Sequence, residues 1–83
     1  MNGVIIAINI PLGVLIAETP DHRCVQLTFL SRVDAQVGDE LDGDWDALGP
    51  QTVSNVTRGT DLQLKLRATD LPRAEAVGSV TVV

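Results

Sequence analysis

The sequence predicts a small all-β barrel of five or six mostly antiparallel strands. Turn residues such as Pro, Gly and Asp recur at strand-like spacing along the 83 residues, which is typical of small barrels. Apolar residues make up 45% of the chain and aromatic residues only 2%. The core must therefore come from Val, Leu and Ile, and β-branched side chains favour strands. The length suits one domain over residues 1–83.

The first three strands are separated by turns with recognisable chemistry. Residues 9–13 contain Pro and Gly, which fix φ and permit a positive φ respectively, so a tight reversal is expected there. Residues 20–22, Pro-Asp-His, make the second turn. The first three strands are predicted at residues 3–10, 14–19 and 23–30, the third with alternating buried and wetter positions.

The second half of the chain begins with a connection at residues 31–38, for which we expect an irregular path or at most one or two helical turns. Residues 62–67 alternate leucine with polar residues and give the clearest strand pattern. Pro72 suits the first position of a helix, so a helical turn is predicted over 72–77. Residues 79–83 are either a frayed tail or an edge strand. The other strands are predicted at residues 39–46 and 50–58.

Residues 2–58 resemble the cold-shock domain family. Residues 49–58 read Gly-Pro-Gln-Thr-Val-Ser-Asn-Val-Thr-Arg, similar to the Gly-Pro-Gln…Asn-Val-Thr-basic run that closes members of that family. Gly3 and Asn9 match the first strand, and Gly38-Asp39-Glu40-Leu41 resembles the start of the fourth. The resemblance implies an OB-type barrel that binds single-stranded nucleic acid, with residues 59–83 as an added strand and tail.

The resemblance does not extend to the aromatic residues on which that family stacks bases, each of which contributes about 1–3 kcal/mol. The one matching aromatic, Phe29, is expected in the core. The net charge is −5, and an acidic chain does not attract phosphate groups. We therefore expect no tight binding of nucleic acid. The positions that match the stacking residues hold Ala7, Val14, Ile16, Gln26 and Thr28.

The apolar replacements predict an interaction patch on the first hairpin. Ala7, Val14 and Ile16 would face out of the barrel, with Leu12 beside them, and an exposed apolar patch marks an interaction site. Its cover is residues 62–83 of the same chain, a second copy of the chain, or another protein. A domain of this size buries only about 60% of its unfolded surface, and its single cysteine forms no internal disulfide. Self-association into a homo-oligomer is therefore expected.

The predicted function is a non-catalytic binding or assembly module that self-associates. Arg23 and Arg58 would form a polar rim around the patch. The alternative is a divergent cold-shock-like protein that binds single-stranded nucleic acid. In that alternative the contacts would come from Arg23, Arg58, Lys65 and Arg67.

Signals for catalysis or for a cofactor are weak. His22 and Cys24 are two residues apart and would share a face if both lay in a strand, but a nucleophile pair needs a third, orienting group. Residues 42–46, Asp-Gly-Asp-Trp-Asp, resemble the start of a calcium loop, yet Ala47 and Val53 stand where that loop needs Gly and Glu. We expect no cofactor and no metal, and a partly buried Trp45.

The expected location is the cytoplasm. A single cysteine fits a reducing compartment. The apolar run at residues 4–17 is too short to span a bilayer. It is not preceded by the basic segment that a signal peptide requires. No membrane association is expected.

Overall fold

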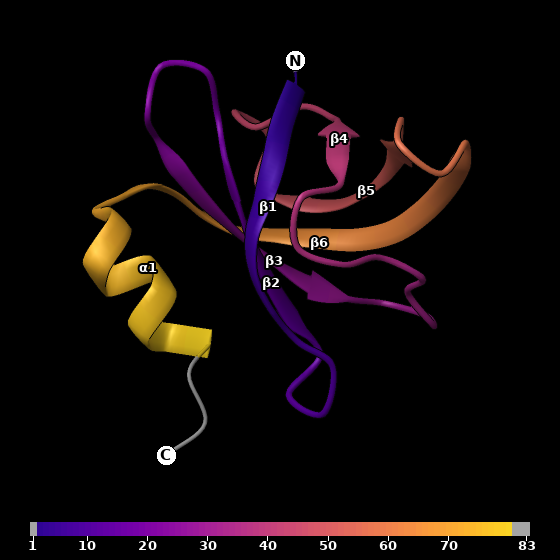
Figure 1. Ribbon diagram of the computed structural model, residues 1–83, viewed down its shortest axis with the longest axis horizontal. Helices are drawn as coiled ribbons and strands as arrows, with labels where there is room; N and C mark the ends of the chain where they lie inside the picture. The colour runs from indigo at the N-terminus through magenta and orange to yellow at the C-terminus, as the bar shows by residue number, and fades with distance from the viewer. Residues whose placement is uncertain (1, 81–83) are drawn as a thin grey trace.

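The structure, a computed structural model, describes residues 2–80 apart from the side chain of Ser79. Six antiparallel strands form a closed barrel in the order β1-β2-β3-β6-β5-β4, and one helix follows them (Figure 1). The predicted small all-β barrel is therefore confirmed. The elements are β1 Asn2–Asn9, β2 Val14–Glu18, β3 Cys24–Phe29, β4 Glu40–Asp42, β5 Gly49–Asn55, β6 Thr60–Leu71 and α1 Arg73–Val80.

Two strands differ most in length from the prediction, and β5 ends at Asn55 rather than at residue 58. The fourth was expected over residues 39–46, but β4 ends at Asp42 because the chain leaves the sheet at Gly43 and turns Trp45 into the interior. β6 is longer than the predicted 62–67 and runs from Thr60 to Leu71. Residues 31–38 are irregular, within the range expected.

The C-terminal segment forms a helix. The turn predicted over 72–77 is part of α1, which extends to Val80. Ser79 and Val80 therefore belong to a helix rather than to the predicted tail or edge strand. The rest of that prediction, residues 81–83, lies outside the described residues.

β6 closes the barrel by pairing with two strands. Its first half pairs with β5, from Thr60 opposite Asn55 to Leu66 opposite Gly49. Its other edge pairs with β3, where Leu64 lies opposite Phe29. This strand lies beyond residues 2–58, the part that resembles the cold-shock family. OB folds are five-stranded and partly open, so the sixth strand is an addition to that plan, and membership of the family stays a prediction.

The barrel interior is filled mainly by aliphatic residues around one indole ring. The alternation in β6 is confirmed, since Leu62, Leu64 and Leu66 are all buried. Trp45 is fully buried rather than partly buried as expected. Close packing fixes its position, because a Cβ atom added to Gly43 would lie 3.0 Å from the ring. Phe29 packs against this core and is partly buried.

Candidate interaction surfaces

Part of the outer face of β1, β2 and β3 is covered by α1, which lies beside these strands in Figure 1. Val14 and Ile16 of β2 point out of the barrel and pack, with Cys24, against Ala76 and Val80 of the helix. The Asn9 side chain secures the end of α1 by donating a hydrogen bond to the Val80 carbonyl, 2.8 Å long. The chain thus supplies its own cover for this apolar face.

The predicted interaction patch is wrong in its most central residues. Val14 and Ile16 face outward as expected, but only 6% and 0% of their surfaces are exposed because α1 lies over them. Ala7 is partly buried at the edge of the same cluster. Of the alternatives for the cover, the C-terminal segment is the one found here. Leu12 alone remains accessible, with 59% of its surface exposed.

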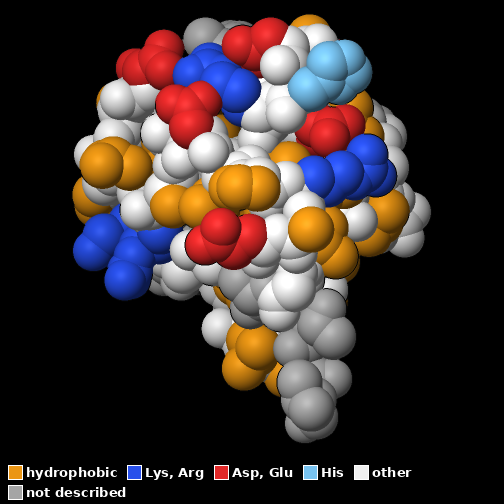
Figure 2. Space-filling view, turned by 90° about the vertical axis from the view of Figure 1, so that its left-hand side faces the viewer, with side chains coloured by type: hydrophobic (Ala, Val, Ile, Leu, Met, Phe, Trp, Pro, Cys, Tyr) orange, Lys and Arg blue, Asp and Glu red, His pale blue; other side chains and the backbone are white. Residues whose placement is uncertain are grey.

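A different apolar surface surrounds Leu12 at the end of the β1–β2 hairpin. Ile10 and Leu30 are also more than half exposed. A backbone hydrogen bond of 2.8 Å from Phe29 to Gly13 holds the end of β3 against the hairpin turn. Figure 1 shows this hairpin turn at the lower end of the barrel, and in Figure 2 apolar side chains are visible toward the lower end of the molecule. We call Ile10, Leu12, Phe29 and Leu30 the tip surface.

The tip surface adjoins an open hollow of about 650 Å³. Ile10 and Phe29 line it together with Arg32, Val33 and Asp34 of the irregular connection. Val33 is buried, whereas Arg32 and Asp34 are exposed on either side of it. Apolar side chains and one charge of each sign therefore meet at the same end of the barrel.

Arg23, predicted as a rim or nucleic-acid residue, is engaged by carboxylates from three parts of the chain. Its guanidinium lies 3.0 Å from Asp21, 3.3 Å from Asp70 and 3.6 Å from Asp46. The cluster ties the β2–β3 turn to the end of β6 and to the β4–β5 connection. In Figure 2 basic side chains near the top of the molecule lie among acidic ones. Arg23 is thus a structural cation rather than one that faces an open groove.

Arg58 is held in a second polar cluster, centred on the buried Asp39. One Asp39 oxygen accepts hydrogen bonds from Asn55 at 3.0 Å, Arg58 at 2.7 Å and the Gln36 backbone at 3.2 Å. The hydrogen bond from Asn55, and then that from Arg58, hold the pKa of Asp39 below its usual value. The cluster joins the connection at residues 31–38 to the turn that follows β5, so it positions one side of the hollow.

Asp39 should make the stability of the domain depend on pH in the acid range. Its pKa is lowered in the folded state, so its contribution is complete above the unfolded value of about 4 and is lost as the pH falls through the lower folded value. Asp39→Asn removes the charge at every pH. The stability difference between wild type and variant, measured by urea unfolding from pH 7 to pH 2, should shrink below about pH 4. A difference that stays constant to pH 2 would contradict this role.

Lys65 and Arg67, the other predicted cations, lie on β6. Lys65 pairs across the sheet with Thr28 and with Pro50, and Arg67 is exposed. Among the described residues neither makes a salt bridge of 4 Å or less. The four predicted cations do not form one basic surface, because Arg23 and Arg58 are each surrounded by acidic residues.

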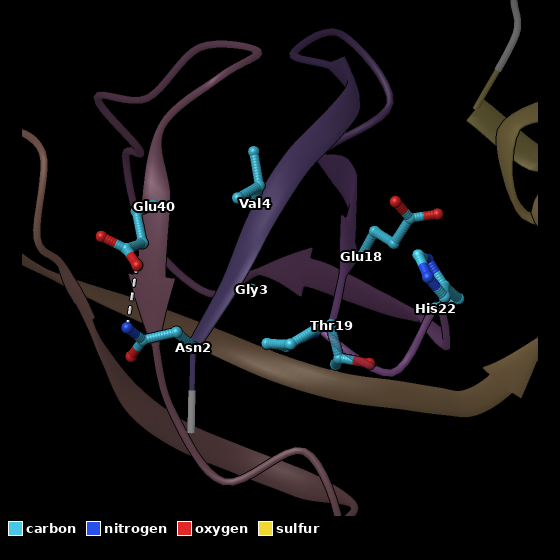
Figure 3. A pocket seen from close by; sticks show the side chains of 8 residues that line it. Asn2, Gly3, Val4, Glu18, Thr19, His22 and Glu40 are labelled. Carbon is cyan, nitrogen blue, oxygen red and sulfur yellow. Dashed lines mark hydrogen bonds between the residues drawn. The ribbon is translucent and has the colours of Figure 1, made fainter.

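A small pocket of about 240 Å³ lies on the outer side of β1, β2 and β4 (Figure 3). Val4 lies between the two glutamates that line it, since it is paired with Glu18 on one side and Glu40 on the other. Asn2 donates a hydrogen bond of 2.8 Å to Glu40, and Glu18 lies 3.5 Å from Arg73. Both carboxylates therefore have partners, and the hydroxyl of Thr19, which also lines the pocket, donates a hydrogen bond to Asp21.

His22 and Cys24 do not form a reactive pair. His22 is exposed in a turn, at φ 65°, whereas Cys24 is fully buried beneath α1. Burial raises the pKa of the Cys24 thiol, which disfavours the nucleophilic thiolate. Within residues 2–80 no group of three or more His, Cys, Asp or Glu side chains is placed to hold a metal ion, the 42–46 segment included. No helix among these residues is long and apolar enough to cross a bilayer.

Sequence reasoning missed three contributors to the surface around Leu12. Ile10 was assigned to the end of a strand, and Leu30 to the end of another, although both are exposed. Arg32 lies in a connection for which no path could be predicted. The available signal was the position of these apolar residues beside turns, where strand alternation no longer buries side chains.

Comparison with known proteins gave no assignment. No family model matches the chain, and neither the curated proteins nor the solved structures include a match to it. Any function must therefore be argued from the surfaces described above.

Proposed function

We propose that this chain is a non-catalytic assembly module that associates with itself through the tip surface. The observation that supports this proposal is the exposure of Ile10, Leu12 and Leu30, at 61%, 59% and 51%, around one end of the barrel. Apolar residues that gather on the surface of a small protein mark sites of interaction. The hollow beside them offers a concave surface into which a partner's side chains can pack.

The alternative, binding of single-stranded nucleic acid, has less support. The positions that match the stacking residues include Val14 and Ile16, which α1 covers. Arg23 and Arg58 are engaged by aspartates, so they offer little charge for the counterion release that drives such binding. The net charge of −5 adds repulsion. A cytoplasmic location remains a prediction of the sequence.

The proposal is tested by backbone amide chemical shifts recorded over a dilution series of the ¹⁵N-labelled protein. As the concentration rises, shifts are expected to move at residues 10–13 and 28–34 and to stay fixed in the first turn of α1, far along the helix from the Asn9–Val80 hydrogen bond. Shift changes that spread evenly over the molecule would reject the tip surface. So would the absence of shift changes up to about 1 mM, a concentration at which even weak specific association is detectable. Oligo(dT) added at about 150 mM salt should leave the spectrum unchanged, and shifts along β1–β3 would favour the alternative.

A further inference from the structure

Arg32 and Asp34 border the hollow and carry opposite charges. They are two residues apart and flank the buried Val33, which fixes the backbone between them. Asp34 has 83% of its side chain exposed, and its nearest cation, Arg58, lies 3.9 Å away. Arg58 makes its short contact, 2.7 Å, with Asp39 instead. Asp34 is thus weakly paired within its own chain.

An interface between two identical chains related by a two-fold axis must be self-complementary. If one residue of the first copy contacts a different residue of the second copy, the same contact is made again with the two copies exchanged. A surface with one cation and one anion beside apolar side chains satisfies this condition. A foreign partner would need no such balance. The chain as a whole carries a charge of −5, so two copies repel each other over most of their surfaces. The end of the barrel beside the hollow carries one charge of each sign, so two copies can approach each other there.

We propose that two copies pack tip to tip about a two-fold axis, with Arg32 of each copy paired to Asp34 of the other. Leu12 and Leu30 then fill the apolar centre of the interface, and the charge pairs form its rim. This inference rests on the proposed function and names the occupant and the geometry of the same surface. A contact built on so few side chains lies at the small end of interface sizes, so a weak, concentration-dependent dimer is expected.

Charge reversal tests this geometry through mixing. Arg32→Asp places two acidic residues on the rim, and Asp34→Arg places two basic ones. Each variant alone should dimerise at least about tenfold more weakly than wild type, because like charges then face each other across the axis. An equimolar mixture restores both pairs, because the acidic rim of one copy meets the basic rim of the other. We expect the mixture to recover a dimer constant near that of wild type.

The measurement is the average mass by sedimentation equilibrium over a concentration series of each variant and of the mixture. Arg67→Asp is the matched control, because it makes the same charge change as Arg32→Asp but on β6. It should dimerise like wild type, apart from the effect of its added negative charge. Circular dichroism checks that each variant is folded, as expected for exposed positions.

The outcomes separate the two proposals. A wild type that stays monomeric overturns both the self-association and the two-fold geometry. A wild type that dimerises, with a mixture no tighter than the single variants, overturns the pairing of Arg32 with Asp34 and leaves the assembly function in place. A mixture that dimerises more tightly than either variant by itself supports the tip-to-tip dimer.

Discussion

Replacing Trp45 with alanine should be among the most destabilising single changes in this domain, at about 3–5 kcal/mol. The indole is fully buried at the centre of a barrel otherwise filled mainly by aliphatic residues. Gly43 lies against the ring, where a Cβ atom would come within 3.0 Å of it. A domain of 83 residues has a total stability of about 4–12 kcal/mol, so this loss would remove from about a quarter to all of it. Urea unfolding followed by circular dichroism measures the loss.

Trp45→Phe is the control for this prediction. The indole nitrogen is buried without a hydrogen-bond partner, which is unfavourable in itself. Phenylalanine removes that N–H group and keeps most of the ring contacts, so it should cost clearly less than alanine. An alanine variant no less stable than the phenylalanine variant would show that the ring does not support the core.

Ile16→Asp and Leu12→Asp should have very different effects, although both residues belong to the patch predicted from the sequence. Ile16 is fully buried beneath α1. Its loss removes about 1.5–3 kcal/mol of apolar burial, and the new carboxylate must displace the helix or be buried at further cost. Leu12 is 59% exposed, so its replacement should change the stability of the folded monomer by no more than about 0.5 kcal/mol.

Cys24 reports on the same contrast, because it is the only cysteine and lies under α1. A thiol reagent should label it slowly in wild type and in Leu12→Asp. In Ile16→Asp, labelling should be much faster under native conditions, since α1 no longer packs on β2. Equal labelling rates in all three proteins would contradict the cover that the structure assigns to α1.

Much of the barrel could be predicted because turn chemistry and strand alternation act locally. Pro11 and Gly13 mark the first reversal, and the leucines of β6 follow a period of two. The short β4 could not be predicted, because it ends where Trp45 turns inward to fill a space that only the closed barrel defines. The pairing of β6 with β3 is likewise a long-range contact that leaves no local pattern.

The candidate site was harder to predict than the fold. The outward direction of Val14 and Ile16 follows from alternation along β2, but the position of α1 over them depends on how the chain returns after β6. The same limit affected Arg23 and Arg58, which appear as free cations in the sequence. Their aspartate partners, such as Asp70 and Asp39, come from distant segments.

The average mass of the wild-type protein as a function of concentration, compared with that of Leu12→Asp, tests the central claim most directly. The tip surface predicts that the wild-type mass rises from that of a monomer toward that of a dimer. The Leu12→Asp mass should stay at the monomer value while the variant remains as stable as wild type. A wild type that remains monomeric at every concentration, or a Leu12→Asp variant that dimerises as tightly as wild type, would contradict the proposed assembly through this surface.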